Sequence, residues 1–235
     1  MFQTFLVQPI YNCFVALVGL MPYGDAGLAI VALTLGMRIL LYPLFTSSIR
    51  TQMGMQQMQP ELERLRERHK DSPKELLKEQ LALNKKYKVR PLSLLLSMAV
   101  QIVVVIALYF ALFREGFPEI QMELLYPFVS VPEAVSTGFF GVLDLLAPRH
   151  VLLAVLVGAT QYLAIRLTLR RTPIPEHLPP ERAVVHRMQQ SMMLYFMPAT
   201  IAVVSYFFAG AVGLYFLASN IISLGQEWLI KKHVL

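Results

Sequence analysis

The residue best able to do chemistry in this sequence is an arginine among apolar neighbours. Arg38 lies within LAIVALTLGMRILLYPLF, a stretch close to the length that crosses a bilayer. A guanidinium stays charged and offers five hydrogen-bond donors, so it attracts carboxylates and other anions. Its placement inside a bilayer costs at least about 2.5–3.5 kcal/mol. Because of this cost, we take an arginine at such a position as a candidate functional residue. The alternative is a side chain that reaches the headgroups.

Other polar residues fall in the same apolar stretches as Arg38 or in similar ones. Thr34 precedes Arg38 by one helical turn, and Ser97 and Gln101 are also one turn apart. Any one of these side chains alone more often bonds to a neighbouring helix. Together with an arginine that has no acidic residue deep in any span, they predict one hydrated binding groove. Its candidate residues are Thr34, Arg38, Ser97, Gln101, Thr160, Gln161, Ser219, Asn220 and Ser223.

The polar residues gather toward one side of the predicted membrane. The outer parts of the first two spans, LAIVAL and IVVVIALYFALF, are almost wholly apolar. We therefore expect a groove that is open to the cytoplasm and sealed outside. A channel or alternating-access transporter more often carries polar residues through both halves.

Signatures of catalysis, metal binding and nucleotide binding are missing from the sequence. The five histidines have no metal-ligand spacing, the single cysteine rules out an internal disulfide, and no G-x-x-x-x-G-K-[ST] loop occurs. We expect no catalytic residue, no metal and no cofactor.

Composition indicates the elements that position these residues. With 56% hydrophobic and only 15% charged residues, the chain is too apolar for a soluble domain. We predict an all-α integral membrane protein with five transmembrane helices, at residues 25–46, 92–113, 151–169, 192–208 and 212–230. A turn at Ala209-Gly210 separates the last two.

The positions of the basic residues predict the orientation. Eighteen of the 21 Lys and Arg lie in segments 46–91 and 166–187 and in the tail. Because positive loops stay cytoplasmic, we expect the N-terminus outside and the C-terminus inside the cell. The basic surplus then needs no nucleic-acid partner. Residues 170–191 become a cytoplasmic loop, 231–235 a short cytoplasmic tail and 114–150 an extracytoplasmic loop.

Residues 1–24 predict an amphipathic helix on the outer membrane surface. Pro9 suits a helix start, and one face collects apolar residues. These are Ile10, Cys13, Phe14, Leu17, Val18 and Met21. The alternative is a frayed end.

Residues 47–91 predict an antiparallel helical hairpin in the cytoplasm. Ser72-Pro73-Lys74-Glu75 is typical of a helix start, with Ser72 as N-cap and Glu75 completing a capping box. Before it, Met53, Met55 and Met58 form a flexible apolar cluster that could capture varied apolar sequences, although such clusters more often only pack helices together.

Four strings, in this order and spacing, resemble the YidC family of membrane protein insertases, which is related to the mitochondrial Oxa and chloroplast Alb proteins. They are LTLGMRILLYPLF, the hairpin MQQMQPELERLRERHKDSPKELLKEQLALNKKYKVRPL, QIVVVIALYFAL, and MQQSMMLYFMP followed by GLYFLASNIISLGQEWL. The resemblance covers about residues 8–232. It implies a location in a bacterial inner membrane. As departures from the family pattern, we expect this sequence to lack the large extracytoplasmic domain of Gram-negative members and their additional N-terminal signal anchor.

The resemblance implies an insertase that makes no covalent change. Its substrates would be nascent membrane proteins, and its surroundings the lipid bilayer. Further possible partners are the Sec translocon, the signal-recognition receptor and the ribosome. Two alternatives stay open: a small anion or peptide transporter that uses Arg38 as its ligand, and a membrane scaffold whose hairpin docks cytoplasmic partners.

Overall fold

The computed structural model describes residues 3–69, 72–110, 118–169 and 180–234. Most described residues are helical; the main exception is the segment 118–150, where one antiparallel pair joins β1 (Gly138–Phe139) to β2 (Leu143–Asp144). The N-terminal region has a π-type turn at Gln3–Val7, α1 (Gln8–Leu20), a 3-10 turn at Pro22–Gly24 and α2 (Ala26–Leu40).

The rest of the chain forms two long helical assemblies. After α2 come α3 (Tyr42–Arg68), α4 (Pro73–Lys86) and α5 (Pro91–Tyr109), then a 3-10 turn at Met122–Leu124 before the strands. The last helices are α6 (Val151–Leu169), α7 (Pro180–Ser191), α8 (Met197–Phe207) and α9 (Gly210–Val234), with a π-type turn at Met192–Phe196 between α7 and α8. The turn expected at Ala209-Gly210 thus lies between α8 and α9.

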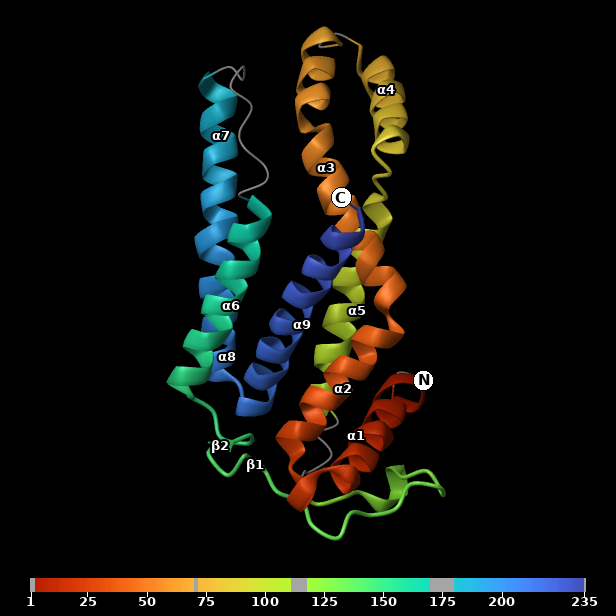
Figure 1. Ribbon diagram of the computed structural model, residues 1–235, viewed down its shortest axis with the longest axis vertical. Coiled ribbons are helices and arrows are strands. Elements are labelled where there is room, and N and C mark those ends of the chain that lie inside the picture. The colour runs from red at the N-terminus through yellow and green to blue at the C-terminus, as the bar shows by residue number, and fades with distance from the viewer. Residues whose placement is uncertain (1–2, 70–71, 111–117, 170–179, 235) are drawn as a thin grey trace.

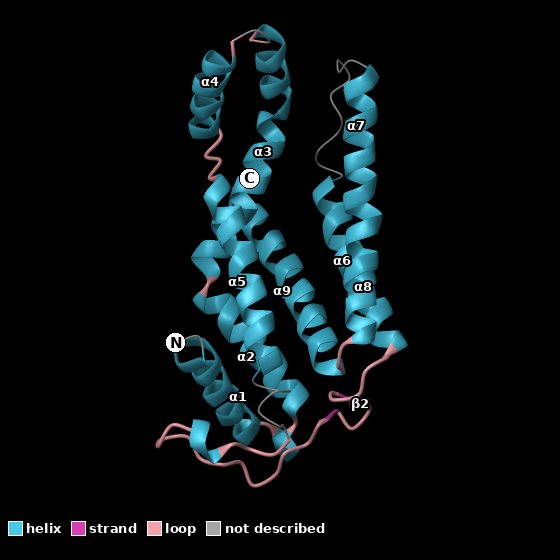
Figure 2. Cartoon of the chain, turned by 180° about the vertical axis from the view of Figure 1, so that it is seen from behind, coloured by secondary structure: helices cyan, strands magenta, loops and turns pink. Residues whose placement is uncertain are grey.

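Helix α9 stands at the centre of the molecule. It packs against α2 on one side and α6 on the other, and α6 also packs along α8. Figures 1 and 2 show α6, α7 and α8 on one flank and α2, α3 and α5 on the other, with α9 between them. The α3–α4 hairpin and α7 project from one end, and β1 and β2 lie at the opposite end (Figure 1).

The first predicted span is broken rather than continuous. Helix α2 ends at Leu40, α3 begins at Tyr42, and the two axes bend by 72°. Pro43 has no N–H, and its ring collides with the carbonyl of residue i−4 in a continued helix, so the chain turns there. Arg38 therefore occupies the last turn of α2, just before the bend.

Among the described residues, two helices are long and apolar enough to cross a membrane. They are Pro91–Tyr109, with a mean hydropathy of 2.4, and the continuous Ala183–Phe207, with 1.2. The bent pair α2 and α3 gives a third if it counts as one span. Part of the segment expected as a loop at 170–191 is therefore helical, because α7 runs on into α8; residues 170–179 lie outside the described residues.

Helix α1 is covered on two faces. Ile10, Phe14 and Val18 join the main apolar core, whereas Tyr11 and Val15 pack under Ile120, Leu124, Leu125 and Val129. Cys13, expected on the apolar face, is exposed. The difference arises because the segment after α5 covers a second side of the helix, which helical periodicity could not reveal.

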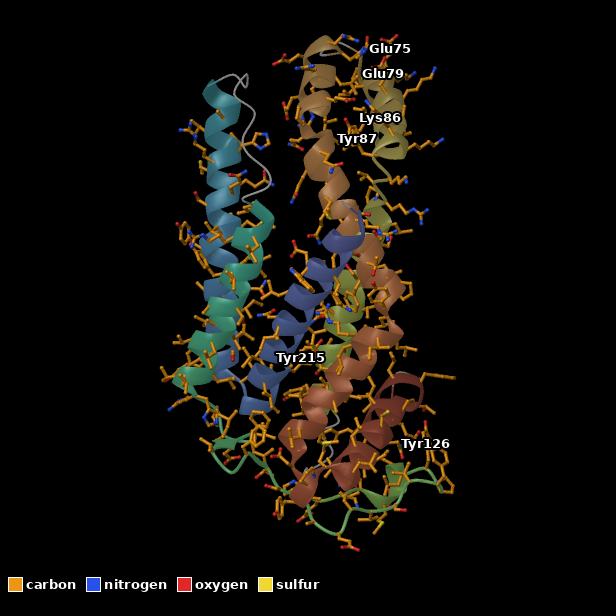
Figure 3. The ribbon with its side chains drawn as sticks, viewed as in Figure 1. Glu75, Glu79, Lys86, Tyr87, Tyr126 and Tyr215 are labelled. Atoms are coloured by element: carbon orange, nitrogen blue, oxygen red, sulfur yellow. The ribbon has the colours of Figure 1, made fainter. Side chains whose placement is uncertain are left out.

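The 118–150 segment is tied to both flanks. Asn12 donates to the Leu124 carbonyl at 2.8 Å and accepts from the Tyr126 N–H at 2.6 Å. At the other flank, Gly210 donates its backbone N–H to the Ala147 carbonyl at 2.9 Å. Figure 3 labels Tyr126 at this end of the molecule.

Asp25 connects the same segment to α2. Its side chain accepts the N–H of Leu28, which caps the helix, and the N–H of Phe140, which holds the strand pair. The distances are 2.9 and 2.8 Å. One carboxylate therefore serves two elements.

Candidate functional site

Arg38 is half-buried between α2, α3 and α9. Its Nη2 donates to Ser219 Oγ at 2.6 Å, and its guanidinium carbon lies 4.2 Å from the centre of the Phe45 ring. A cation over an aromatic face gains from the ring quadrupole. Among the residues that the structure describes, no carboxylate pairs with Arg38. The charge is thus held by a hydroxyl and a ring, and it is not neutralised.

Three more polar side chains surround this charge. Tyr215 and Gln101 line one small cavity together with Arg38. Thr34 is buried beside them and donates its hydroxyl to the Ile30 carbonyl at 2.7 Å. Figure 3 labels Tyr215 on α9, where this helix faces α2. We call Thr34, Arg38, Gln101, Tyr215 and Ser219 the Arg38 cluster.

The space inside the Arg38 cluster is small. A cavity of about 10 Å³ lies beside Arg38. Its lining includes Thr34, Gln101, Tyr215, Phe45 and Val104. A cavity needs about 10–15 Å³ to hold one water. This cavity therefore holds about one water at most, and a wide hydrated groove stays a prediction.

A second polar group lies on the other side of α9. Asn220 Nδ2 donates to Thr160 Oγ1 at 3.2 Å and to the Val157 carbonyl at 3.4 Å. Consecutive helical residues point about 100° apart at 3.6 residues per turn. Ser219 therefore faces α2 while Asn220 faces α6, and the predicted residues form two groups rather than one.

The other candidates take no part in these bonds. Ser97 donates to the carbonyl of Leu94 at 2.9 Å, within its own helix. Gln161 and Ser223 are half-buried. Tyr215 and Phe45 lie beside Arg38 but were not among the residues expected there from the sequence. The i, i+4 spacing of Tyr215 and Ser219 was the available signal.

An apolar layer closes the space between the Arg38 cluster and the strand-bearing end. It contains Ile30, Ala107, Leu108, Leu145 and Ala211, each at most 5% exposed. That this layer seals a groove on the outer side of the membrane stays a prediction.

The α3–α4 hairpin has its own small core. Met58, Leu62 and Val89 are buried together, with Leu83 and Tyr87 packed against them. Met53 instead lines a cavity at the hairpin base, and Met55 is exposed. The three methionines therefore share no single surface.

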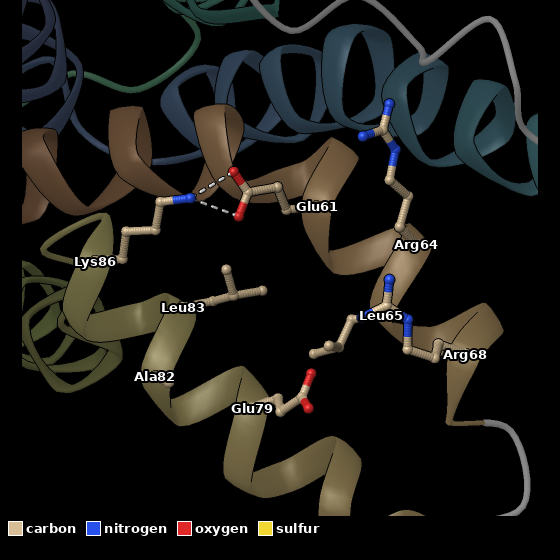
Figure 4. Close-up of a pocket in the computed structure, with 8 residues that line it drawn as sticks. All are labelled: Glu61, Arg64, Leu65, Arg68, Glu79, Ala82, Leu83 and Lys86. Carbon is tan, nitrogen blue, oxygen red and sulfur yellow. Dashed lines mark hydrogen bonds and ion pairs between the residues drawn. The ribbon is translucent and has the colours of Figure 1, made fainter.

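Glu61 links the two hairpin helices. Lys86 Nζ donates to both of its carboxylate oxygens, at 2.7 and 2.9 Å, and the Tyr87 hydroxyl donates to one of them. Lys86, then Tyr87, lowers the pKa of Glu61, and Glu61 in turn raises the pKa of Lys86 and of Tyr87. Figure 4 shows this pair at one side of a cavity of about 450 Å³ between α3 and α4.

The predicted capping box does not form. Ser72 precedes α4 as expected but makes no side-chain cap bond, and the Glu75 carboxylate lies 3.2 Å from His69 Nδ1. The His69 ring therefore engages the carboxylate that the capping box required.

Comparisons with known proteins bear on the whole chain. Residues 19–235 match the family model described as the 60Kd inner membrane protein. A relative called membrane protein insertase YidC, from Histophilus somni strain 129Pt, is 31% identical over 230 residues, which is 97% of this chain and 37% of the relative. A protein of the same name from Francisella tularensis subsp. novicida is 31% identical over 211 residues, 89% of this chain and 33% of the relative. The chain spans about a third of the length of these curated relatives.

Proposed function

Since this chain belongs to the 60Kd inner membrane protein family, the family of the YidC insertases, we propose that it inserts small membrane proteins into the bilayer. The observation that carries this proposal is the match over residues 19–235, which includes every element of the Arg38 cluster. Insertion needs no covalent step, so we assign no catalytic residue.

The proposed arrangement is a five-span protein with its N-terminus outside and its C-terminus in the cytoplasm. Beside the two long apolar helices, this arrangement needs three further spans. Helix α2 together with the start of α3 forms one, α6 forms the second and α9 forms the third. The excess of Lys and Arg around the α3–α4 hairpin supports a cytoplasmic location for that end.

Arg38 is the proposed attraction point for a substrate. Its charge, which has no carboxylate partner, lies in surroundings less polar than water, where attraction to an acidic group is stronger. An acidic segment that reaches this depth has only the apolar layer of α2, α5 and α9 left to cross. The small cavity implies that an incoming segment separates these helices.

The proposed exit route runs along α5 and the Ala183–Phe207 helix. These two spans are the least enclosed, with 17% and 11% of their apolar windows buried. A substrate helix that leaves along them enters lipid, and the transfer of its apolar surface from water supplies the driving free energy. Nascent chains, the Sec translocon, the signal-recognition receptor and the ribosome are proposed partners, with the hairpin as their first contact.

The experiment is insertion of a short single-span substrate with an acidic translocated tail into liposomes that contain the purified protein. Arg38→Ala should reduce insertion by about tenfold, equal to about 1.4 kcal/mol, whereas Arg38→Lys should keep most of it because charge is the proposed requirement. Arg187→Ala removes an exposed arginine on α7 and serves as the matched control. Equal insertion by the wild type and Arg38→Ala would falsify the role of Arg38.

A transporter that uses Arg38 as its ligand predicts a polar path to the far side. The apolar layer beyond the Arg38 cluster argues against that path. Counterflow of a small anion in the same liposomes, without substrate insertion, would favour the transporter.

A further inference from the structure

A second, larger cavity lies at the base of the α3–α4 hairpin. It has a volume of about 990 Å³ and is enclosed by the first turns of α3, the end of α4 and the connection from α4 to α5. This volume matches that of small-molecule sites, which run to about 1,000 Å³. Neither the Arg38 cluster nor the cavity in Figure 4 includes any of its charged side chains.

The wall of this cavity is strongly basic. Arg50 comes from α3, Lys85 from α4, and Lys88 and Arg90 from the connection. The wall as described carries no acidic side chain. These four positive charges have no counter-charge in the cavity, so it favours an anion that accepts several hydrogen bonds.

The backbone that carries these charges is held firmly. Thr51 Oγ1 accepts the Arg90 N–H at 3.2 Å and lies 3.1 Å from Ser93 Oγ, while Ser48 Oγ donates to the Ser93 carbonyl at 2.7 Å. Lys88 has a φ of 54°, which is uncommon for a residue with a side chain. Such strain persists only where the surroundings impose it and often marks a functional site. The backbone of this wall is therefore held in place, while its four basic side chains are exposed.

Exposed apolar residues flank the two chain segments that form the basic wall, at the start of α3 and at the start of α5. Tyr42 and Pro43 line the cavity, and Tyr42 comes two residues after Leu40, which is 76% exposed. Leu92, 74% exposed, comes two residues after Arg90 at the start of an apolar span. A phosphate bound among the basic side chains would thus have hydrocarbon chains attached to it beside apolar helices, which is the geometry of a membrane lipid.

We propose that this cavity binds the phosphate of an anionic phospholipid from the leaflet on the hairpin side. Arg50, Lys85, Lys88 and Arg90 contact the headgroup, and the acyl chains lie along α2 and α5. The lipid would brace the hairpin against the membrane. This site is independent of substrate insertion.

The test is native mass spectrometry of the full chain released from nanodiscs that contain equal amounts of phosphatidylglycerol and phosphatidylcholine. Wild type should retain phosphatidylglycerol preferentially. Lys85→Gln/Lys88→Gln should weaken retention by roughly ten- to thirtyfold, because each basic side chain near a lipid surface contributes about 1 kcal/mol.

The matched control is Lys74→Gln/Lys78→Gln, which removes the same charge from exposed positions of α4 outside the cavity. It should retain phosphatidylglycerol like the wild type. Equal losses in the two variants would indicate diffuse attraction and overturn the site, as would equal retention of the two lipids by the wild type. A further measurement adds inorganic phosphate at millimolar concentration as a competitor for the cavity. Competition as effective as that by phosphatidylglycerol would indicate a site for free anions and would overturn the lipid assignment.

Discussion

Adjacent residues in this protein serve separate polar groups. Ser219 accepts a bond from Arg38, whereas Asn220 bonds to Thr160 on α6. The sequence indicated that both would be polar positions inside the bundle, and both are. It did not reveal that they face different helices, because that depends on which neighbours pack around α9.

Gly54 allows the closest approach of α3 to the α4–α5 connection. A Cβ at this position would collide with the Tyr87 carbonyl oxygen and lie 3.0 Å from a methyl carbon of Val89. Gly54→Ala should therefore destabilise the hairpin base by about 1–3 kcal/mol, as overpacking does. The measurement is the rate of proteolysis within the hairpin, together with the Tm in detergent.

Gly36→Ala is the matched control for Gly54→Ala. No other heavy atom lies within 4 Å of its added Cβ, so the change should be neutral or stabilising by up to about 1 kcal/mol. Equal proteolysis rates in the two variants would contradict the close packing at Gly54.

At the scale of elements, Asp25 connects α2 to the strand pair. Asp25→Asn leaves one accepting oxygen where two are used, by Leu28 and by Phe140. One of the two hydrogen bonds is lost, and the new side-chain NH2 group then faces a backbone N–H, which is also a donor. The free energy of unfolding should therefore fall by about 1–2 kcal/mol. Thermal unfolding in detergent measures it.

Glu133→Gln is the comparison for Asp25→Asn, because Glu133 is exposed in the same segment. A Tm unchanged by Asp25→Asn would show that this carboxylate does not hold the segment to α2.

The Glu61–Lys86–Tyr87 contact predicts a pH window for the hairpin. Lys86 lowers the pKa of Glu61 below 4.5, so this stabilisation is present above pH 4.5 and is lost as the pH falls through the lower, folded value. Glu61 raises the pKa of Lys86 above 10.5, and the stabilisation is lost as the pH rises through that higher value. The hairpin should therefore open more readily at both extremes, by the small amount that an exposed ion pair contributes.

The distance between spin labels at Arg68→Cys and Lys78→Cys, in a Cys13→Ser background, reports this opening. Glu61→Gln should remove the acid-side change, and Glu67→Gln, an exposed neighbour on α3, should keep it. An identical acid response in both variants would argue against the role of Glu61.

At the scale of the whole molecule, the strand pair and the α3–α4 hairpin lie at opposite ends (Figure 1). The proposed orientation predicts that Val142→Cys, at a position 90% exposed, reacts with an impermeant maleimide in intact cells. Lys78→Cys should react only after permeabilisation, since positive segments stay cytoplasmic. Both variants need Cys13→Ser, and the reverse pattern would invert the topology.

The sequence by itself determined the helical class, the hairpin, and the apolar spans at α5 and at 192–208, and it singled out Arg38 as a charge within an apolar stretch. These follow from local properties: hydrophobic runs, proline positions and the cost of charge in lipid. Only the tertiary structure decided that α2 bends away from α3, that Tyr215 and Phe45 lie beside Arg38, and that the connection beside Gly54 forms a basic cavity. The physical reason is that packing between helices far apart in the chain sets which face of each helix meets which partner, and periodicity along one helix does not contain that information.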